Sequence, residues 1–221
     1  MERWVKMEDI SDGKLYDRDD MVRADCGGCE GCSACCRKMG KSIILDPYDI
    51  FRLTAKMGKT FEELMAGCIE LNVVDGIILP NLSMNGREES CAFLSEEGRC
   101  SIHSFRPGIC RLFPLGRLYE NGGFKYFLQT HECRKNSRVK VKIRKWIDTP
   151  EPERYENFVI SWHYFLKDMS RYLADKGDPE KEKQINLTLL KLFYMLPYDP
   201  ERDFYEQFGE RLNMAGKIKT D

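Results

Sequence analysis

A run of closely spaced cysteines near the N-terminus constrains this chain more than any other feature of its sequence. The run consists of Cys26, Cys29, Cys32, Cys35 and Cys36. A C-x2-C turn directs two thiolates towards one point, and thiolates are strong ligands for zinc and for iron–sulfur clusters. The run contains three glycines and shows no hydrophobic periodicity, so we expect its fold to depend on what the cysteines bind.

The cysteine content also bears on the cellular compartment. A chain of 221 residues is too long to need disulfides for its stability. Residues 1–20 are acidic and lack the apolar stretch of a secretory signal, so we expect a cytoplasmic location in which thiols stay reduced. We interpret Cys68 as a small buried apolar residue. The other candidate metal ligands outside the run are Cys91, Cys100, Cys110 and Cys133.

The spacing leaves two kinds of metal centre open. The run contains the C-x2-C-x2-C-x3-C spacing of bacterial ferredoxins, which favours an iron–sulfur cluster. Because adjacent side chains usually diverge, Cys35 and Cys36 suggest two neighbouring centres or one polynuclear cluster. Without Cys68 there are enough cysteines for two zinc sites of four thiolates each, or for one [4Fe–4S] cluster with others left over.

Basic residues and a histidine accompany these cysteines. We expect Arg106, Arg111 and His131 to lie beside the metal centre without binding the metal. A nearby cation lowers the pKa of a thiol, and it offsets the net charge of about −2 on a zinc ion with four thiolates. The alternative for the two arginines is that they are ordinary surface charges in a chain rich in Lys and Arg.

We predict an α+β fold with three parts. They are a polar N-terminal segment at residues 1–25, a small cysteine-rich, metal-organised domain at 26–147 and a helical C-terminal extension at 148–221. Asp46, as a cap, predicts a helix over 47–57, and a capping box of Thr60 and Glu63 predicts another over 61–71. The other expected elements are a strand at 41–45, an extended segment at 73–84, a hairpin-like clasp at 91–103, a short helix at 104–113, a hairpin at 115–130, a half-buried strand at 134–146, and helices at 152–173, 179–196 and 200–215.

Composition narrows the class of partner. With 35 basic and 36 acidic residues, the chain shows no charge excess that would call for nucleic acid or an anionic membrane. A protein or peptide is the partner class left open. The sequence also lacks the G-x-G-x-x-G and Walker A motifs and the C-x3-C-x2-C arrangement of radical-SAM enzymes.

Several motifs in the same order resemble one known family. They are Cys29-x2-Cys32-x2-Cys35-Cys36, Asp49-Ile-Phe-Arg-Leu, Cys91-Ala-Phe-Leu, Gly98-Arg-Cys100-Ser-Ile-His103, Arg106-Pro-Gly-Ile-Cys110-Arg-Leu-Phe-Pro114 and Cys133. Together they are similar to the YkgJ-type cysteine-cluster proteins, also called the CxxCxxCC zinc- or iron-chelating domain, over roughly residues 26–147. Some members of that family are labelled Fe–S-cluster proteins or flagellin N-methylases.

The resemblance implies that eight of the cysteines belong to the family pattern, with Cys26 as an additional one. It implies zinc or an iron–sulfur cluster as cofactor, and His103 is not expected to be a ligand. We therefore expect a metal-binding protein whose further task is undefined. The alternatives are an iron-dependent or Fe–S enzyme that modifies a protein or peptide by methylase-like or redox chemistry, and a protein for metal storage or delivery.

Overall fold

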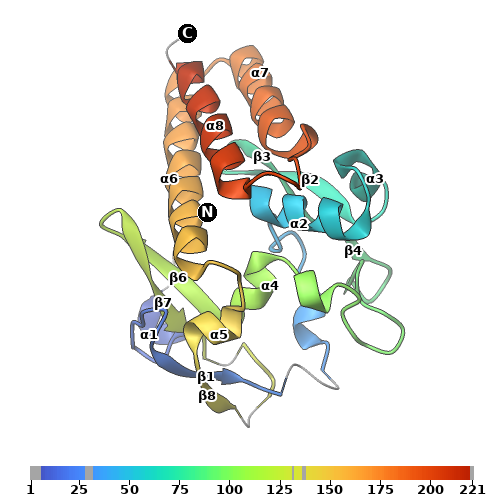
Figure 1. Ribbon diagram of the computed structural model, residues 1–221, viewed down its shortest axis with the longest axis vertical. Coiled ribbons are helices and arrows are strands. Elements are labelled where there is room, and N and C mark those ends of the chain that lie inside the picture. Colours follow the sequence, from blue (N-terminus) through green and yellow to red (C-terminus); the bar gives the residue numbers. More distant parts are fainter. Residues whose placement is uncertain (1–5, 28–31, 131, 136–137, 220–221) are drawn as a thin grey trace.

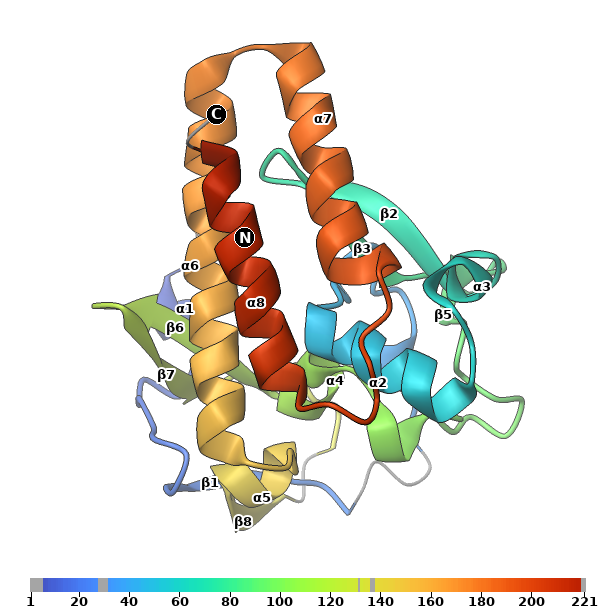
Figure 2. The ribbon, with the colours of Figure 1, turned by 45° about the horizontal axis from the view of Figure 1, so that its top comes forward.

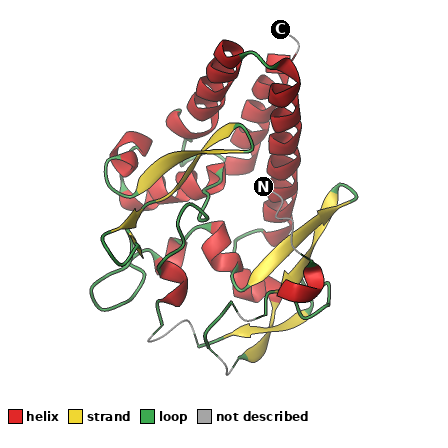
Figure 3. Cartoon of the chain, turned by 180° about the vertical axis from the view of Figure 1, so that it is seen from behind, coloured by secondary structure: helices red, strands yellow, loops and turns green. Residues whose placement is uncertain are grey.

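The fold is α+β, as the sequence predicts. The computed structural model describes residues 6–27, 32–130, 132–135 and 138–219. In this part of the chain the strands form separate two-stranded antiparallel pairs, β1–β8, β2–β3, β4–β5 and β6–β7 (Figure 3). The long helices gather at one end, and β1, β8 and α5 lie at the opposite end (Figure 1). The bounds in the first half are α1 Met7–Ile10, β1 Met21–Asp25, α2 Pro47–Met57, α3 Phe61–Met65, β2 Ile69–Val74, β3 Ile77–Leu82, β4 Met84–Asn85 and β5 Ser90–Cys91.

The elements of the second half follow the predicted order closely. Their bounds are α4 Gly108–Leu112, β6 Leu115–Glu120, β7 Gly123–Leu128, β8 Val139–Lys142, α5 Ile143–Ile147, α6 Pro152–Lys176, α7 Pro179–Leu190 and α8 Phe204–Gly216. The segment expected as one half-buried strand is therefore a short strand followed by a helical turn. The last helix begins at Phe204 because Asp203 is its cap, accepting a hydrogen bond from the Glu206 N–H.

The N-terminal segment lies along the β6–β7 hairpin and then joins β8. The Tyr16 N–H donates to the Tyr126 carbonyl at 2.8 Å, and the Tyr126 N–H donates back at 2.9 Å. β1 then pairs with β8, with Met21 opposite Lys142. This pairing brings the two ends of the cysteine-rich part close to each other.

Local capping explains α2, but tertiary structure shortens α3. Asp46 and Asp49 form a reciprocal capping box at the start of α2, and Gly58 ends it with a φ of 62°. The helix expected over 61–71 ends at Met65 instead, because the chain turns and enters β2. The extended segment expected at 73–84 belongs to a hairpin, whose Asp75-Gly76 turn has positive φ at both residues.

The strand expected at 41–45 is wrong. Only an isolated bridge joins Ile44 to Asn81, and the Leu45 N–H donates to the Pro80 carbonyl at 2.9 Å. The Leu82 N–H donates in turn to the Ile43 carbonyl at 3.0 Å, so the segment pairs with β3 only around this bridge. Its buried side chains, Ile43 and Leu45, pack into the core. Its backbone then turns directly into α2.

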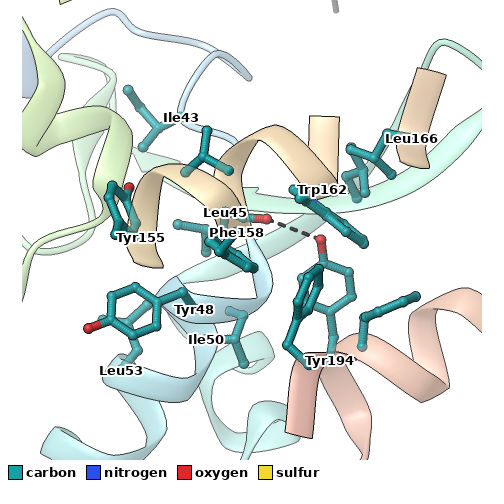
Figure 4. Close-up of a cluster of buried hydrophobic side chains, with 14 of the residues drawn as sticks. Ile43, Leu45, Tyr48, Ile50, Leu53, Tyr155, Phe158, Trp162, Leu166 and Tyr194 are labelled. Carbon is teal, nitrogen blue, oxygen red and sulfur yellow. Dashed lines mark hydrogen bonds between the residues drawn. The ribbon is translucent and has the colours of Figure 1, made fainter. Parts of the chain in front are cut away.

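The C-terminal helices and α2 share one hydrophobic core. α6 and α8 run side by side, and α2 lies beside the lower end of α8, below α7 (Figure 2). Tyr48 of α2 contacts Phe158 of α6 and Phe204 of α8, with ring centroids 6.1 and 4.9 Å away. Tyr194 donates a hydrogen bond to the Leu45 carbonyl at 3.2 Å (Figure 4). No helix in the described part of the chain combines the length and apolar character needed to cross a bilayer.

Candidate metal centre

The described cysteines that were predicted as ligands form two groups, each defined by electrostatic interactions among its thiols. Cys68, which was not predicted as a ligand, also interacts electrostatically with Cys91. The inner group is Cys35, Cys36, Cys91, Cys100 and Cys110. The outer group is Cys26, Cys32 and Cys133. None of these described cysteines forms a disulfide, and neither does Cys68. Cys29 and His131 lie outside the described residues.

Backbone pairing brings the N-terminal run to Cys91. Cys35 and Cys36 lie on a 3₁₀ turn, and Arg37 directly after it forms a bridge with Ser90 at the start of β5. The Arg37 guanidinium also donates to Ser90 Oγ at 2.7 Å. These contacts hold the turn beside the strand that ends at Cys91.

The hairpin-like clasp expected around residues 91–103 supplies Cys100. Leu94 bridges to Cys100, and the Ser95 N–H donates to the Arg99 carbonyl at 2.8 Å. The Ser101 N–H then donates to the Phe93 carbonyl at 2.9 Å. The clasp therefore folds back on itself and returns Cys100 to the vicinity of Cys91.

Cys110 lies on α4, which three buried or part-buried hydrogen bonds hold against its neighbours. The Gly108 N–H donates to Asp49 Oδ1 of α2 at 2.7 Å. Arg111 Nε donates to the Ile147 carbonyl at 2.9 Å, and Trp146 Nε1 donates to the Phe113 carbonyl at 3.1 Å. These bonds fix α4 between α2 and α5.

The β1–β8 pair brings together two cysteines of the outer group. Cys26 comes directly after β1, and Cys133 lies a few residues before β8. Asp25 and Val139 are partners at this end of the pair, so the two cysteines lie near the same end of the ribbon. Burial raises the pKa of Cys133, and the thiols of Cys26 and Cys32 raise it further.

Cys35 and Cys36 do not diverge as expected for adjacent residues. Their side chains share a hydrogen bond, which mainly accounts for the fall of the Cys35 pKa to about 6, with a smaller contribution from the Arg106 charge. The same bond and burial raise the pKa of Cys36. Cys35 therefore loses its proton more readily than Cys36, and the thiolate is the form that binds metals.

The comparison with known families agrees with this geometry. A family model named CxxCxxCC, described as a putative zinc- or iron-chelating domain, matches residues 28–140, just over half of the chain. The chain belongs to the CxxCxxCC family. No curated protein and no solved structure matches it. The match confirms the resemblance seen in the motifs, and zinc or iron is the metal that this class of domain binds.

The donors of the CxxCxxCC domain suit such a metal. Thiolates favour zinc and iron–sulfur clusters over hard cations such as magnesium. Within the described ranges, no three Cys, His, Asp or Glu side chains are already spaced as ligands of one ion. The inner group nonetheless fits zinc or iron by the chemistry of its donors, and the role of each cysteine as a ligand stays a prediction.

The two arginines expected beside the metal centre differ in position. Burial is the main cause of the raised pKa values of Cys100 and Cys110, and the Arg106 charge opposes it in both. Arg106 Nη1 also donates to His103 Nε2 at 3.3 Å. Arg111, 4% exposed, is instead directed to the Ile147 carbonyl, so its hydrogen bond serves the α4–α5 contact.

Three residues that position Cys110 were not predicted from the sequence. Asp49 is only 4% exposed, and burial raises its pKa to about 6 although backbone N–H groups stabilise its charge. A side chain on Gly108 would collide with the hydroxyl of Tyr155. The Arg106-Pro-Gly and Asp49-Ile-Phe-Arg motifs were visible signals for Gly108 and Asp49, but nothing marked Tyr155.

Proposed function

We propose that this protein binds zinc or an iron–sulfur centre through thiolates of the inner group. The observation that carries the proposal is the convergence of thiols from four separate segments: the 3₁₀ turn, β5, the clasp and α4. Cys35 is central to this arrangement, because its charge affects the pKa of Cys36, Cys91, Cys100 and Cys110.

The surrounding residues support a metal ion rather than a disulfide framework. Arg106 offsets the negative charge that several thiolates would bring to a partly buried place. When bound, the metal would also contribute binding free energy to folding, because it would join segments distant in the sequence. Free thiols are needed for this role, so we infer that the protein works in a reducing compartment.

The outer group would form a second set of ligands. The β1–β8 pair brings Cys26 near Cys133, and Cys32 interacts electrostatically with Cys133. Two sets of thiolates would correspond to two metal centres, which is one of the alternatives that the number of cysteines leaves open. The expected content is then more than one metal per chain.

Metal analysis of anaerobically purified protein tests the proposal. A brown solution with iron and labile sulfide indicates a cluster, and a colourless one with zinc indicates tetrahedral zinc sites. The Cys110→Ser variant should lose metal, because it removes an inner-group thiolate.

Cys68 provides the matched control. Its thiol donates a hydrogen bond to the Leu64 carbonyl at 3.4 Å, which requires the protonated form. Serine can make the same bond, so Cys68→Ser should keep the wild-type metal content. Wild-type protein without zinc or iron, or equal loss from both variants, would overturn the proposal.

A further inference from the structure

The helix that carries Cys110 is held at its first residue by a carboxylate from another helix. The Gly108 N–H donates to Asp49 Oδ1 at 2.7 Å, in a buried position. Cys110 follows two residues later and interacts electrostatically with Asp49 and, more weakly, with Cys91 and Cys35. The Asp49 carboxylate therefore connects the rigid core helix α2 to the inner group.

The Asp49 side chain is fixed at both ends of its carboxylate. Asp49 Oδ2 accepts from the Asp46 backbone N–H at 3.1 Å. The Asp49 backbone N–H donates to Asp46 Oδ1 at 2.8 Å. Because Oδ1 accepts from the Gly108 N–H and Oδ2 accepts from the Asp46 N–H, the side chain has little rotational freedom. The start of α4 is thereby set at a definite position relative to α2.

Gly108 is also in close contact with Tyr155 of α6. The hydroxyl of Tyr155 lies where a Cβ atom on Gly108 would be, and Asp49 Oδ1 is 3.7 Å from that position. The residue therefore sits between α2 and α6 with no room for a side chain. A shift of the Asp49 carboxylate would move α4, and with it the thiol of Cys110.

We propose that Asp49 is a positioning residue of the metal centre, which places the Cys110 thiol by holding the first backbone N–H of α4. This inference rests on the proposed function, because it assumes that Cys110 binds the metal. A carboxylate close to a thiolate is electrostatically unfavourable, so a favourable charge effect does not explain its presence. The hydrogen bonds that it accepts, from the Asp46 N–H in the capping box and from the Gly108 N–H, do explain it, and only the second reaches α4.

Two substitutions at Asp49 separate position from charge. Asp49→Asn removes the charge and keeps an oxygen that can accept from the Gly108 N–H. Its amide nitrogen cannot accept from the Asp46 N–H, so this variant should also lose some stability through the weaker helix cap. Asp49→Glu keeps the charge and moves the carboxylate by one methylene. A positioning role predicts that the Glu variant binds metal about 10- to 100-fold more weakly, while the Asn variant stays close to wild type.

The readouts are the retention of native zinc or iron in the full-length protein under an EDTA challenge, and the number of sulfur ligands from X-ray absorption. Asp46→Ala is the matched control. It weakens the cap of the same helix, but its backbone N–H still donates to Asp49. This variant should lose stability and keep the wild-type metal affinity and sulfur count.

The Cys110→Ser variant distinguishes a failure of the proposed function from a failure of the positioning role alone. If it keeps the wild-type metal content, the proposed function fails. If Cys110→Ser loses metal, but Asp49→Glu and Asp49→Asn retain metal equally, only the positioning role fails. An Asn variant that loses metal while the Glu variant keeps it would show that charge matters, and would also overturn the positioning role.

Discussion

The hydroxyl of Tyr155 occupies the space beside Gly108 that any side chain would need. This contact joins α6, in the C-terminal helical segment, to the first residue of the helix that carries Cys110. The C-terminal helices thus help to shape the cysteine-rich part of the molecule, although the family match ends at residue 140.

The first prediction concerns Gly108→Ala. The new methyl group would displace Tyr155 or α4, so we expect the free energy of unfolding to fall by about 1–3 kcal/mol, as is typical of overpacking. Urea denaturation measures this change. Gly209→Ala in α8 is the control, since nothing lies within 4 Å of its added carbon, and it should be neutral or stabilising by up to about 1 kcal/mol.

The Tyr155→Phe substitution tests the cause of that loss. It removes the colliding oxygen, and the ring carbon Cζ lies 3.5 Å from the position of the added methyl group, which is an ordinary contact. The double variant should therefore be more stable than the sum of the two single effects predicts. Simple additivity of the two free energies would contradict the contact.

The second prediction is a pH dependence of metal binding. The Arg106 charge lowers the pKa of Cys35, Cys100 and Cys110, so Arg106→Gln should raise all three. Ligand thiols must lose their protons to bind metal, and the variant therefore needs a higher pH to reach the same affinity. We expect its affinity for zinc to fall more at pH 6 than at pH 8.

Competition with a chelator at several pH values measures this dependence. Arg171→Gln is a suitable control, because Arg171 is an exposed residue of α6 that pairs with Asp168 at 3.2 Å. It should leave the pH profile unchanged. An Arg106→Gln curve parallel to that of the wild type would show that Arg106 does not act on the ligand thiols.

Capping and turn signals allowed much of the fold to be predicted, because they act over a few residues. Asp46 and Gly58 fix the ends of α2 in this way. The early end of α3 was not predictable, since the pairing of β2 with β3 decides it. The motifs marked the cysteines, whereas the contact of Tyr155 with Gly108 joins residues far apart in the sequence and leaves no local pattern.

The third prediction concerns removal of the metal. The core between α2 and the C-terminal helices is built from residues such as Tyr48, Phe158 and Phe204. The predicted ligands Cys91, Cys100 and Cys110 pack against the outside of the buried cluster and are not among its fully buried members. Treatment with a chelator should therefore leave most of the helical circular dichroism. Hydrogen exchange should become faster in α4 and in the clasp, and it should stay slow in α6 and α8. A loss of protection in all of these elements would contradict a helical core that is stable without metal.

X-ray absorption at the metal edge tests the central claim most directly, because it reports which atoms surround the bound ion. For anaerobically purified wild-type protein we expect a first shell of sulfur atoms at about 2.3 Å, and fewer sulfur atoms or less bound metal in Cys110→Ser. A first shell made only of nitrogen and oxygen, or a sulfur shell and metal content unchanged in Cys110→Ser, would contradict a metal centre built from the inner group.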